Sequence, residues 1–356
     1  MRAENPSQSV QLAITSPSTS TLAVHITGFV RSRVGGRASK TLQMPVDIPR
    51  ELRFLPLRGS AAVASGLLSR GQLEGKTWRR LFPDVYVAAD IELNHRLMCE
   101  AALLYTGRWP RHSPVAASGL SAAYLMGVNL LPLSGAKVEL TSAAYIRLRH
   151  DGLAAVRSPM VQEDIQTSMG LPHTSPERTV FDLARRLDRV HAVSAIDALL
   201  HRRLTTLDKA RSYLLGASMF RGRNRVSEVF SLADPLSESP MESELRLVII
   251  DDGLPRPECQ VRVFDLNGSV VARLDLAYRA LRIGIEYEGD HHRDRATFRR
   301  DIARVRALQA VDWTIMRATA ADIYYPDNFL RELRSLIEGA SRMITLSGHS
   351  DGIHRL

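Results

Sequence analysis

The chain has 356 residues, of which 45% are hydrophobic and 24% are charged, so it can form two or three domains that each bury a core. It contains no apolar run of about eighteen residues and no basic-then-apolar N-terminus, so we expect neither a membrane partner nor a secretory signal. Two distant cysteines, Cys99 and Cys259, fit neither a disulfide framework nor a zinc motif. They are typical of reduced thiols, and we expect a cytoplasmic protein.

The net charge of +9 is unevenly distributed along the chain. Residues 1–43 hold five Lys/Arg and one acid, and residues 44–236 hold 25 Lys/Arg and 18 acids. From Ser237 onward there are 17 Arg, no Lys and 19 acids. The basic excess of the first two thirds favours a polyanionic partner such as DNA. The acids from Ser237 onward favour chemistry that uses a metal ion. A base-composition bias toward arginine explains the missing lysines but not the grouping of the acids.

Residues 1–43 are rich in Ser, Thr and Gly and have no sustained helical or strand period. Such a segment cannot bury enough apolar surface to offset the entropy lost on ordering it. We therefore expect residues 1–55 to be a flexible arm, or translated sequence ahead of a later start at Met44.

Residues 56–90 have the pattern of two short helices followed by a hairpin. Gly66 would end the first helix, and Ser69 is a suitable N-cap for the second. Residues 78–87 alternate around a Pro-Asp pair, which is typical of a β-hairpin. The order predicts a winged-helix module, and residues 67–87 resemble the N-terminal domain of AbiEi-type antitoxin proteins. The resemblance implies a DNA partner, with these arginines as candidate contacts: Arg70, Arg79 and Arg80.

Residues 91–232 are predicted to be a mainly helical α+β domain. Ser175 followed by Pro176 is a strong helix start, and four residues separate Arg178 from Asp182, which predicts an ion pair on the helix surface. Residues 174–185 (TSPERTVFDLAR) also resemble AbiEi-type antitoxins, which implies a possible cognate toxin. Further helices are predicted over residues 97–105, 116–125 and 190–201, and a strand over residues 137–141.

A turn-rich linker is predicted at residues 233–240, the last domain at residues 237–342 and a tail at residues 343–356. Ser239 and Pro240 open a helix that Gly253 ends. Strands are predicted over residues 260–264, 270–278, 281–288 and 313–318, and helices over residues 293–310 and 328–337.

Three carboxylates fall on two of these predicted strands. Alternation places Asp275 on the face opposite Leu274 and Leu276, and it places Glu286 and Glu288 together on one face of the next strand. If the strands are neighbours, the three charges converge. Two such charges about 4 Å apart repel by about 4 kcal/mol at an effective dielectric near 20. A divalent cation such as Mg²⁺ or Mn²⁺ would relieve this repulsion, because hard cations bind oxygen ligands.

The order helix, three strands, helix, strand, with an acid on the second strand and Glu-x-Glu on the third, resembles the PD-(D/E)XK nuclease superfamily. Within it, residues 239–246, 253–260 and 275–293 resemble an uncharacterised family related to very short patch repair (Vsr) endonucleases. The resemblance implies a restriction-endonuclease-like αβββαβ domain that hydrolyses phosphodiester bonds. The implied metal ligands are Glu242, Asp275 and Glu286, and Glu288 and His292 would position or deprotonate water.

Two departures from the superfamily pattern concern the base. The lysine that orients the attacking water is absent, and Glu288 stands at its position. Glu288 also replaces the family's usual aspartate, which lengthens the side chain by one methylene. His292 is the alternative base, since a neutral imidazole accepts a proton near pH 7, although it could equally cap or pack against the following helix. Arg299 and Arg300 on that helix are candidate contacts to the DNA backbone.

The sequence therefore predicts a multi-domain α/β protein and leaves two functions open. In the first, a DNA-binding protein carries a Mg²⁺- or Mn²⁺-dependent endonuclease domain. In the second, a non-catalytic, antitoxin-like DNA-binding regulator retains a degenerate nuclease fold. The retained acids favour the first function, and the missing lysine favours the second.

Overall fold

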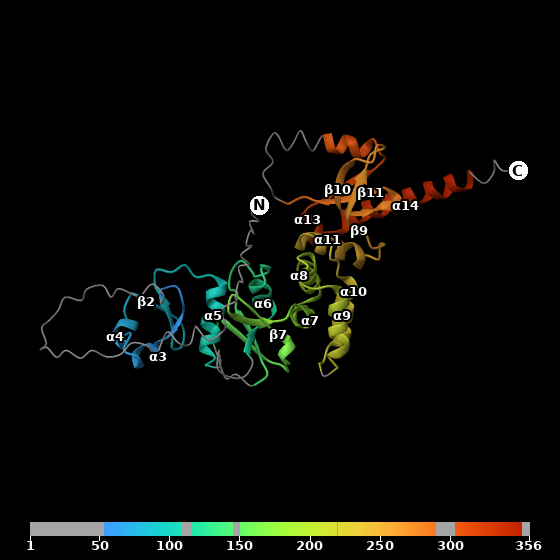
Figure 1. Cartoon of the computed structure of the whole chain (residues 1–356). Helices are drawn as coiled ribbons and strands as arrows, with labels where there is room; N and C mark the ends of the chain where they lie inside the picture. The colour runs from blue at the N-terminus through green and yellow to red at the C-terminus, as the bar shows by residue number, and fades with distance from the viewer. Residues whose placement is uncertain (1–52, 108–114, 145–149, 219, 290–302, 351–356) are drawn as a thin grey trace, which may run out of the picture. The chain divides into compact units, whose positions relative to one another are not determined.

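The computed structural model describes residues 53–107, 115–144, 150–218, 220–289 and 303–350 (Figure 1). They belong to two compact units, one containing residues up to 80 with 84–91, and the other containing residues 81–83 and those from 92 onward. The predicted N-terminal arm to residue 52, the last residues 351–356, His292, Arg299 and Arg300 lie outside the described residues. No described helix is both long enough and apolar enough to cross a membrane.

The N-terminal unit contains two short helices and a three-stranded sheet of order β1-β3-β2. Ser69 accepts a hydrogen bond from the backbone of Gln72, whose side chain accepts one in return, so the predicted N-cap is a full capping box. The elements are β1 (Leu57–Arg58), α3 (Gly59–Ala64), α4 (Arg70–Leu73), β2 (Trp78–Phe82) and β3 (Val85–Ala88). The helices and the hairpin occur where predicted, and the assignment as a winged helix stays a prediction.

The second unit begins with a five-stranded sheet of order β6-β5-β4-β8-β7. Its strands are β4 (Val115–Ala117), β5 (Val138–Ser142), β6 (Leu153–Arg157), β7 (Ile165–Ser168) and β8 (Leu171–Thr174). The accompanying helices are α5 (His95–Tyr105), α6 (Gly119–Leu125), α7 (Pro176–Arg186), α8 (Arg189–His201), α9 (Leu207–Gly216) and α10 (Arg223–Leu232). A single apolar core joins α7 to α10, and Ser175 caps α7 as predicted.

The helix predicted over residues 116–125 is wrong in its first part, which is strand β4. The chain turns from β4 into α6 at Gly119, which has a φ of +54°. A Cβ there would lie 2.0 Å from Oε2 of Glu139, because that carboxylate packs on the start of α6 and accepts a hydrogen bond from the Leu120 backbone. The left-handed glycine therefore divides the apolar run into a strand and a helix.

The Arg178–Asp182 ion pair forms as predicted, at 2.9 Å, but its predicted surface location is wrong. Both side chains are fully buried. Arg178 also pairs with Asp164 at 2.8 Å and donates to Ser158 Oγ and to the Pro159 carbonyl. The guanidinium is buried because the segment between β6 and β7, together with Asp182 of α7, supplies enough acceptors to replace water.

The C-terminal part of the second unit has a four-stranded sheet of order β12-β11-β10-β9, in which β11 and β12 are parallel and the other pairs antiparallel. One face packs against helices α11 and α14, and the other packs against the helical stretch at residues 303–309. The elements are α11 (Pro240–Asp251), β9 (Glu258–Phe264), β10 (Val270–Tyr278), β11 (Ile283–Tyr287), β12 (Thr314–Ala318), α13 (Ala320–Tyr324) and α14 (Asp327–Ser350). The restriction-endonuclease-like assignment stays a prediction.

The simple alternation predicted for β10 is wrong at Asp275. Leu274 packs with the core on the residue 303–309 side, whereas Leu276 packs with the core on the α11 side. Opposite Asp275, the β9 residue Gln260 has a φ of +53°, so both strands change face at this point. The register places Gln260 and Asp275 opposite each other at this change of face.

The predicted linker, residues 233–240, lies beside a set of contacts that joins α8 to α11. Arg246 of α11 is fully buried and pairs with Asp197 of α8 at 2.6 Å. Asp197 also accepts from the Ser243 hydroxyl and from the Asp234 backbone. Leu247 completes the apolar core of α7 to α10. Helix α11 thus belongs to the packing of both parts of the second unit.

Candidate functional site

Glu242 and Asp275 lie on either side of the Gln260 side chain. Glu242 is in the first turn of α11, where Ser239 caps the helix, and only 8% of its surface is exposed. Its Oε2 accepts hydrogen bonds from Gln260 Nε2 at 2.9 Å and from the Glu238 backbone at 3.0 Å. Gln260 is also close enough to Asp275 to lower the pKa of that carboxyl. The predicted helix acid and first strand acid are therefore brought together by a glutamine.

Asp275 and Glu286 lie on adjacent antiparallel strands. The register that pairs Leu276 with Ile285 places these two acids opposite each other at the end of the ladder. The ladder stops there because Asp275 Oδ2 accepts the Tyr287 backbone N–H at 2.9 Å. The prediction that the two carboxylates share one patch agrees with this register.

Glu286 on β11 and Glu288, which directly follows β11, each form an ion pair with an arginine. Glu286, which is 9% exposed, forms an ion pair with Arg304 of the helical stretch at residues 303–309. Glu288 pairs with Arg317 of β12 at 2.7 Å. In the parallel register Arg317 lies beside Glu286. Two guanidinium groups therefore lie among the acids of this patch.

Burial sets the ionisation of the two inner acids. It raises the pKa of Glu242, and the nearby Asp275 charge raises it further, against the lowering effect of the hydrogen bonds from Glu238, Ser239 and Gln260. Burial also raises the pKa of Asp275, opposed by the Tyr287 N–H and by Arg304. Desolvation lowers the pKa of Arg304. The cluster is thus a desolvated, mixed-charge site.

The described residues do not fit a divalent metal centre as they are arranged. Among them, no group of three His, Cys, Asp or Glu side chains converges on one point. Glu286 and Glu288 are each directed to a guanidinium, and Glu242 faces an amide. Sequence reasoning missed Gln260, Arg304 and Arg317 as partners of the acids. Strand pairing alone could have indicated Arg317, since it needs only the parallel register.

The three predicted DNA contacts of the N-terminal unit are all exposed. Arg70 begins α4, and Arg79 and Arg80 are consecutive exposed residues of β2, although Arg79 also donates to the Ala89 carbonyl. Residues 53–91 contain six Lys/Arg and three acids. Asp84 and Asp90 pair with Arg58 and Arg53. Most of the remaining positive charge of this unit is therefore contributed by α4 and β2.

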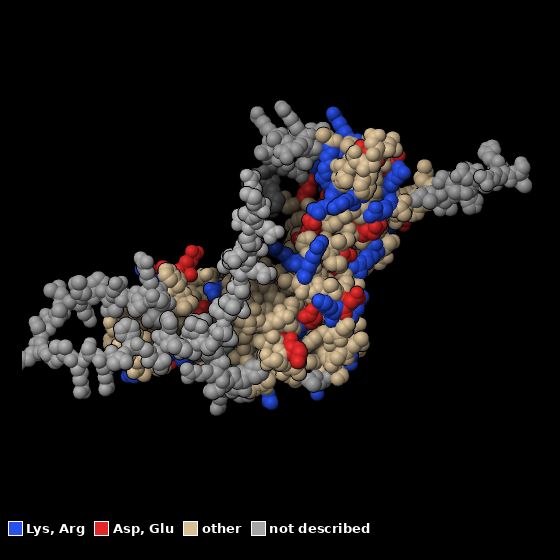
Figure 2. Space-filling view, in the orientation of Figure 1, with Lys and Arg blue, Asp and Glu red and all other residues tan. Residues whose placement is uncertain are grey.

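In the view of Figure 2, positive and negative side chains alternate over the C-terminal sheet and its helices. Arg273 of β10 illustrates the pattern, since it forms two hydrogen bonds of 2.7 Å with the Glu238 carboxylate. The described part of this face is mixed in sign, which differs from the uniformly basic stripe that binds a phosphate backbone.

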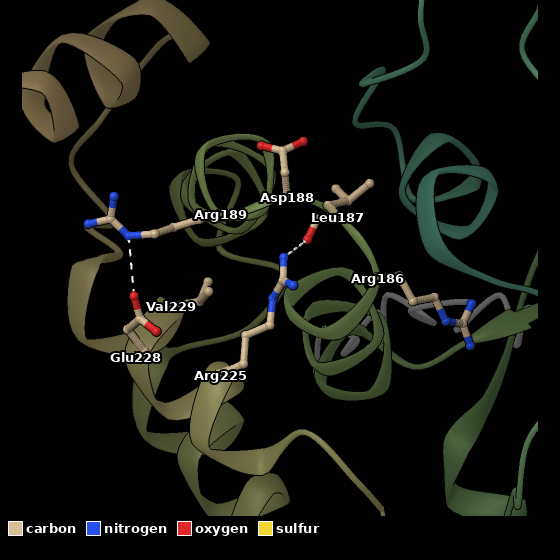
Figure 3. Close-up of a pocket in the computed structure, with 7 residues that line it drawn as sticks. All are labelled: Arg186, Leu187, Asp188, Arg189, Arg225, Glu228 and Val229. Atoms are coloured by element: carbon tan, nitrogen blue, oxygen red, sulfur yellow. Dashed lines mark hydrogen bonds and ion pairs between the residues drawn. The ribbon is translucent and has the colours of Figure 1, made fainter.

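An open cavity of about 460 Å³ lies between the α7–α8 turn and α10 (Figure 3). Arg225 donates to the Leu187 carbonyl across it, and Arg189 pairs with Glu228 at 3.3 Å and with Asp251 at 2.7 Å. Arg186 points away from these residues, toward the strands, where it donates to Thr141 Oγ1. The three arginines that line the cavity all bind other groups of the protein. We therefore interpret the cavity as a gap at a helix junction.

Residues 130–232 match the family model of the AbiEi antitoxin C-terminal domain. This range runs from the loop before β5 to the end of α10 and confirms the AbiEi-like part of the prediction. It leaves residues 237–342, with the acidic cluster, outside the match. The matched residues therefore include the strands and helices around the buried Arg178.

Two proteins of Mycobacterium tuberculosis are similar to the chain over 164 residues at 36% identity: Uncharacterized protein MT2308 (strain CDC 1551 / Oshkosh) and Uncharacterized protein Rv2248 (strain ATCC 25618 / H37Rv). The alignment spans 45% of this chain and 59% of each relative. The crystal structure of RV2827C protein from Mycobacterium tuberculosis aligns with 60% of this chain and 84% of that chain, at 12% identity and a TM-score of 0.37. That score is too low to assign a fold.

Proposed function

We propose that the chain is an antitoxin-like DNA-binding regulator, acting in the cytoplasm and able to bind a cognate toxin. The match of residues 130–232 to the AbiEi antitoxin C-terminal domain carries this proposal. In it, the N-terminal unit contacts DNA as a winged helix, and the AbiEi-like part binds the toxin. The C-terminal α/β part contributes to binding or assembly.

The charge of the N-terminal unit supports the DNA contact. Its exposed arginines are carried by a capped helix and by the hairpin that follows it, so their positions are fixed by short, well-defined elements. Arginine is suited to phosphate because its planar guanidinium forms two parallel hydrogen bonds. The expected contacts are Arg70, Arg79 and Arg80.

Salt-dependent DNA binding tests this contact. Phosphate contacts release counterions, so the affinity for a labelled generic duplex should fall steeply with salt, with a logarithmic slope of about −0.9 per phosphate neutralised. Arg70→Ala should weaken binding to all sequences and make the slope shallower by about one. The measurement is fluorescence anisotropy over a salt series.

Arg211→Ala is the matched control, since Arg211 is an exposed arginine of α9, outside the N-terminal unit. It should leave both the affinity and the slope unchanged. Salt-insensitive binding, or none at all, would remove the DNA-binding part of the proposal and leave the toxin-binding part to be tested by itself.

The pairing of the acids with arginines favours a non-catalytic C-terminal part. Metal-dependent cleavage by Glu242, Asp275, Glu286, Glu288 and His292 stays a prediction of the sequence. Nicked, mismatched, single-stranded and supercoiled DNA, incubated with Mg²⁺ or Mn²⁺, should remain intact. Cleavage that disappears in Asp275→Ala and Glu286→Ala would overturn the non-catalytic proposal and restore the nuclease function.

A further inference from the structure

The acidic cluster of the C-terminal sheet contains arginines as well as acids. Among the described residues, Arg304 and Arg317 lie beside three of its acids, Asp275, Glu286 and Glu288. Two guanidinium groups supply the same charge as one divalent cation. Each is bound to one of the glutamates, and Arg304 also interacts electrostatically with Asp275.

We propose that Arg304 and Arg317 are built-in counter-cations of this cluster. With them in place, the C-terminal sheet folds around these acids and needs no divalent metal ion. The proposal goes beyond the regulatory function, because it assigns a role to two residues that the proposed DNA and toxin contacts do not use. It rests on the same pairing of acids with arginines as the non-catalytic C-terminal part, but its readouts are ion binding and stability, not DNA binding or cleavage.

The fold directs Arg304 into the cluster. Arg304 precedes Leu308 by one helical turn, so the two side chains share a face of the stretch at residues 303–309. Leu308 is 1% exposed and packs with Leu274 in the core on that side of the sheet. Packing of Leu308 therefore holds Arg304 over the strands, whereas Arg306, two residues later, is exposed.

The position of Arg317 follows from the parallel pairing of β11 and β12. Ile315 packs with the core on the residue 303–309 side, and Arg317, two residues further along β12, points to the same side. There it reaches Glu288. The charge of Arg317 lowers the pKa of Arg304, which places the two guanidinium groups near one another. Two neighbouring like charges are stable here because carboxylates lie between them.

Mn²⁺ binding and thermal unfolding of the full chain test the proposal. The wild-type protein should show no saturable Mn²⁺ binding by electron paramagnetic resonance, and its Tm should be the same in EDTA and in Mn²⁺. The double variant Arg304→Gln with Arg317→Gln should have a lower Tm in EDTA. It should gain saturable Mn²⁺ binding and recover part of the Tm when Mn²⁺ is added, because the acids are then without their cations.

Arg306→Gln is the matched control, and it should behave as the wild type. Adding Asp275→Asn to the double variant should abolish the gained Mn²⁺ binding. Saturable Mn²⁺ binding by the wild type that Asp275→Asn removes would overturn the proposal, as would a folded double variant that gains no Mn²⁺ binding. If the double variant does not fold, Arg317→Gln alone gives the same readouts, because that side chain is 38% exposed and its loss is less disruptive.

Discussion

Arg178 is one of the largest fully buried side chains in the described part of the chain. It is held by Asp164, Asp182, Ser158 and the Pro159 carbonyl, and Tyr213 donates to the same Asp164 at 2.8 Å. Desolvation opposes its charge, but the two carboxylates outweigh that effect and the pKa of Arg178 is raised. The residue joins α7 to the loop before β7 at the centre of the AbiEi-like part.

Arg178→Ala should lower the free energy of unfolding by about 3–5 kcal/mol, because it leaves Asp164 and Asp182 buried without their cation. Urea unfolding followed by circular dichroism measures the change. Arg211→Ala is the comparison, since its pair with Asp208 is exposed and 3.9 Å long; its loss should cost at most about 1 kcal/mol. Equal effects of the two substitutions would contradict the structural role given to Arg178.

The sequence predicted the Arg178–Asp182 pair from its spacing, but it could not predict the burial. An i, i+4 ion pair looks the same on an exposed and on a buried helix face. What buries this one is Asp164, fourteen residues earlier in the chain, and no local pattern connects the two. The same holds for Arg304 and Glu286, which are distant in sequence and adjacent in the fold.

At the scale of elements, β10 was predicted with its observed bounds, because it follows the Asn267–Gly268 turn and apolar residues dominate it. The reversal of its faces at Asp275 was not predictable. It depends on Gln260 adopting a positive φ, which is uncommon for a residue other than glycine. Strands β6 and β7 were missed because they are short and carry few buried residues.

Gly284 of β11 tests the packing behind this reversal. A Cβ at this position would lie 2.6 Å from Leu274 Cδ1 and 2.8 Å from Ile315 Cδ1. The first contact exists because Leu274 has turned to the residue 303–309 side of the sheet, where Ile315 also packs. Gly284→Ala should therefore lower the free energy of unfolding by about 1–3 kcal/mol, the usual cost of overpacking a core. Urea unfolding measures it.

Gly339→Ala, in the middle of α14, is the control of opposite sign. Nothing lies within 4 Å of a Cβ at that position, and alanine in a helix interior is favoured over glycine by about 0.5–1 kcal/mol. It should stabilise the protein slightly. A Gly284→Ala protein as stable as the wild type would show that Leu274 does not occupy the space assigned to it.

At the scale of the second unit, α11 links the acidic cluster to the AbiEi-like part. Its first turn carries Glu242, which faces Gln260, and the same helix carries Ser243, Arg246 and Leu247, which face α8 and its neighbours. The family match ends at residue 232, so the helix that completes the AbiEi-like core lies outside it. We expect a chain ended at residue 236 to expose this core and to be less stable than the full chain.

Asp197 at this junction gives the unit a dependence on pH. Burial raises the pKa of Asp197 to about 6, against the lowering effects of Arg246, the Asp234 backbone and Ser243, while the Asp234 charge raises it. An unfolded aspartate has its ordinary pKa near 3.8. The folded state therefore binds the proton more tightly than the unfolded state between these values. This contribution to stability is present in full below about pH 4 and is lost as the pH rises through about 6.

Asp197→Asn should accordingly reduce the slope of the unfolding free energy against pH between about pH 4 and pH 6. The reduction should be at most the slope that the release of one proton produces. The asparagine keeps a carbonyl that can accept from the Asp234 backbone, so this hydrogen bond is retained while the titrating carboxyl is removed. It also leaves Arg246 without its counter-ion, so the variant should be less stable at pH 7 than the wild type. Other buried carboxyls, such as Glu139, have a raised pKa as well and contribute to both proteins alike. Thermal unfolding over a pH series decides the matter, and parallel profiles for the two proteins would show that Asp197 does not titrate in this range.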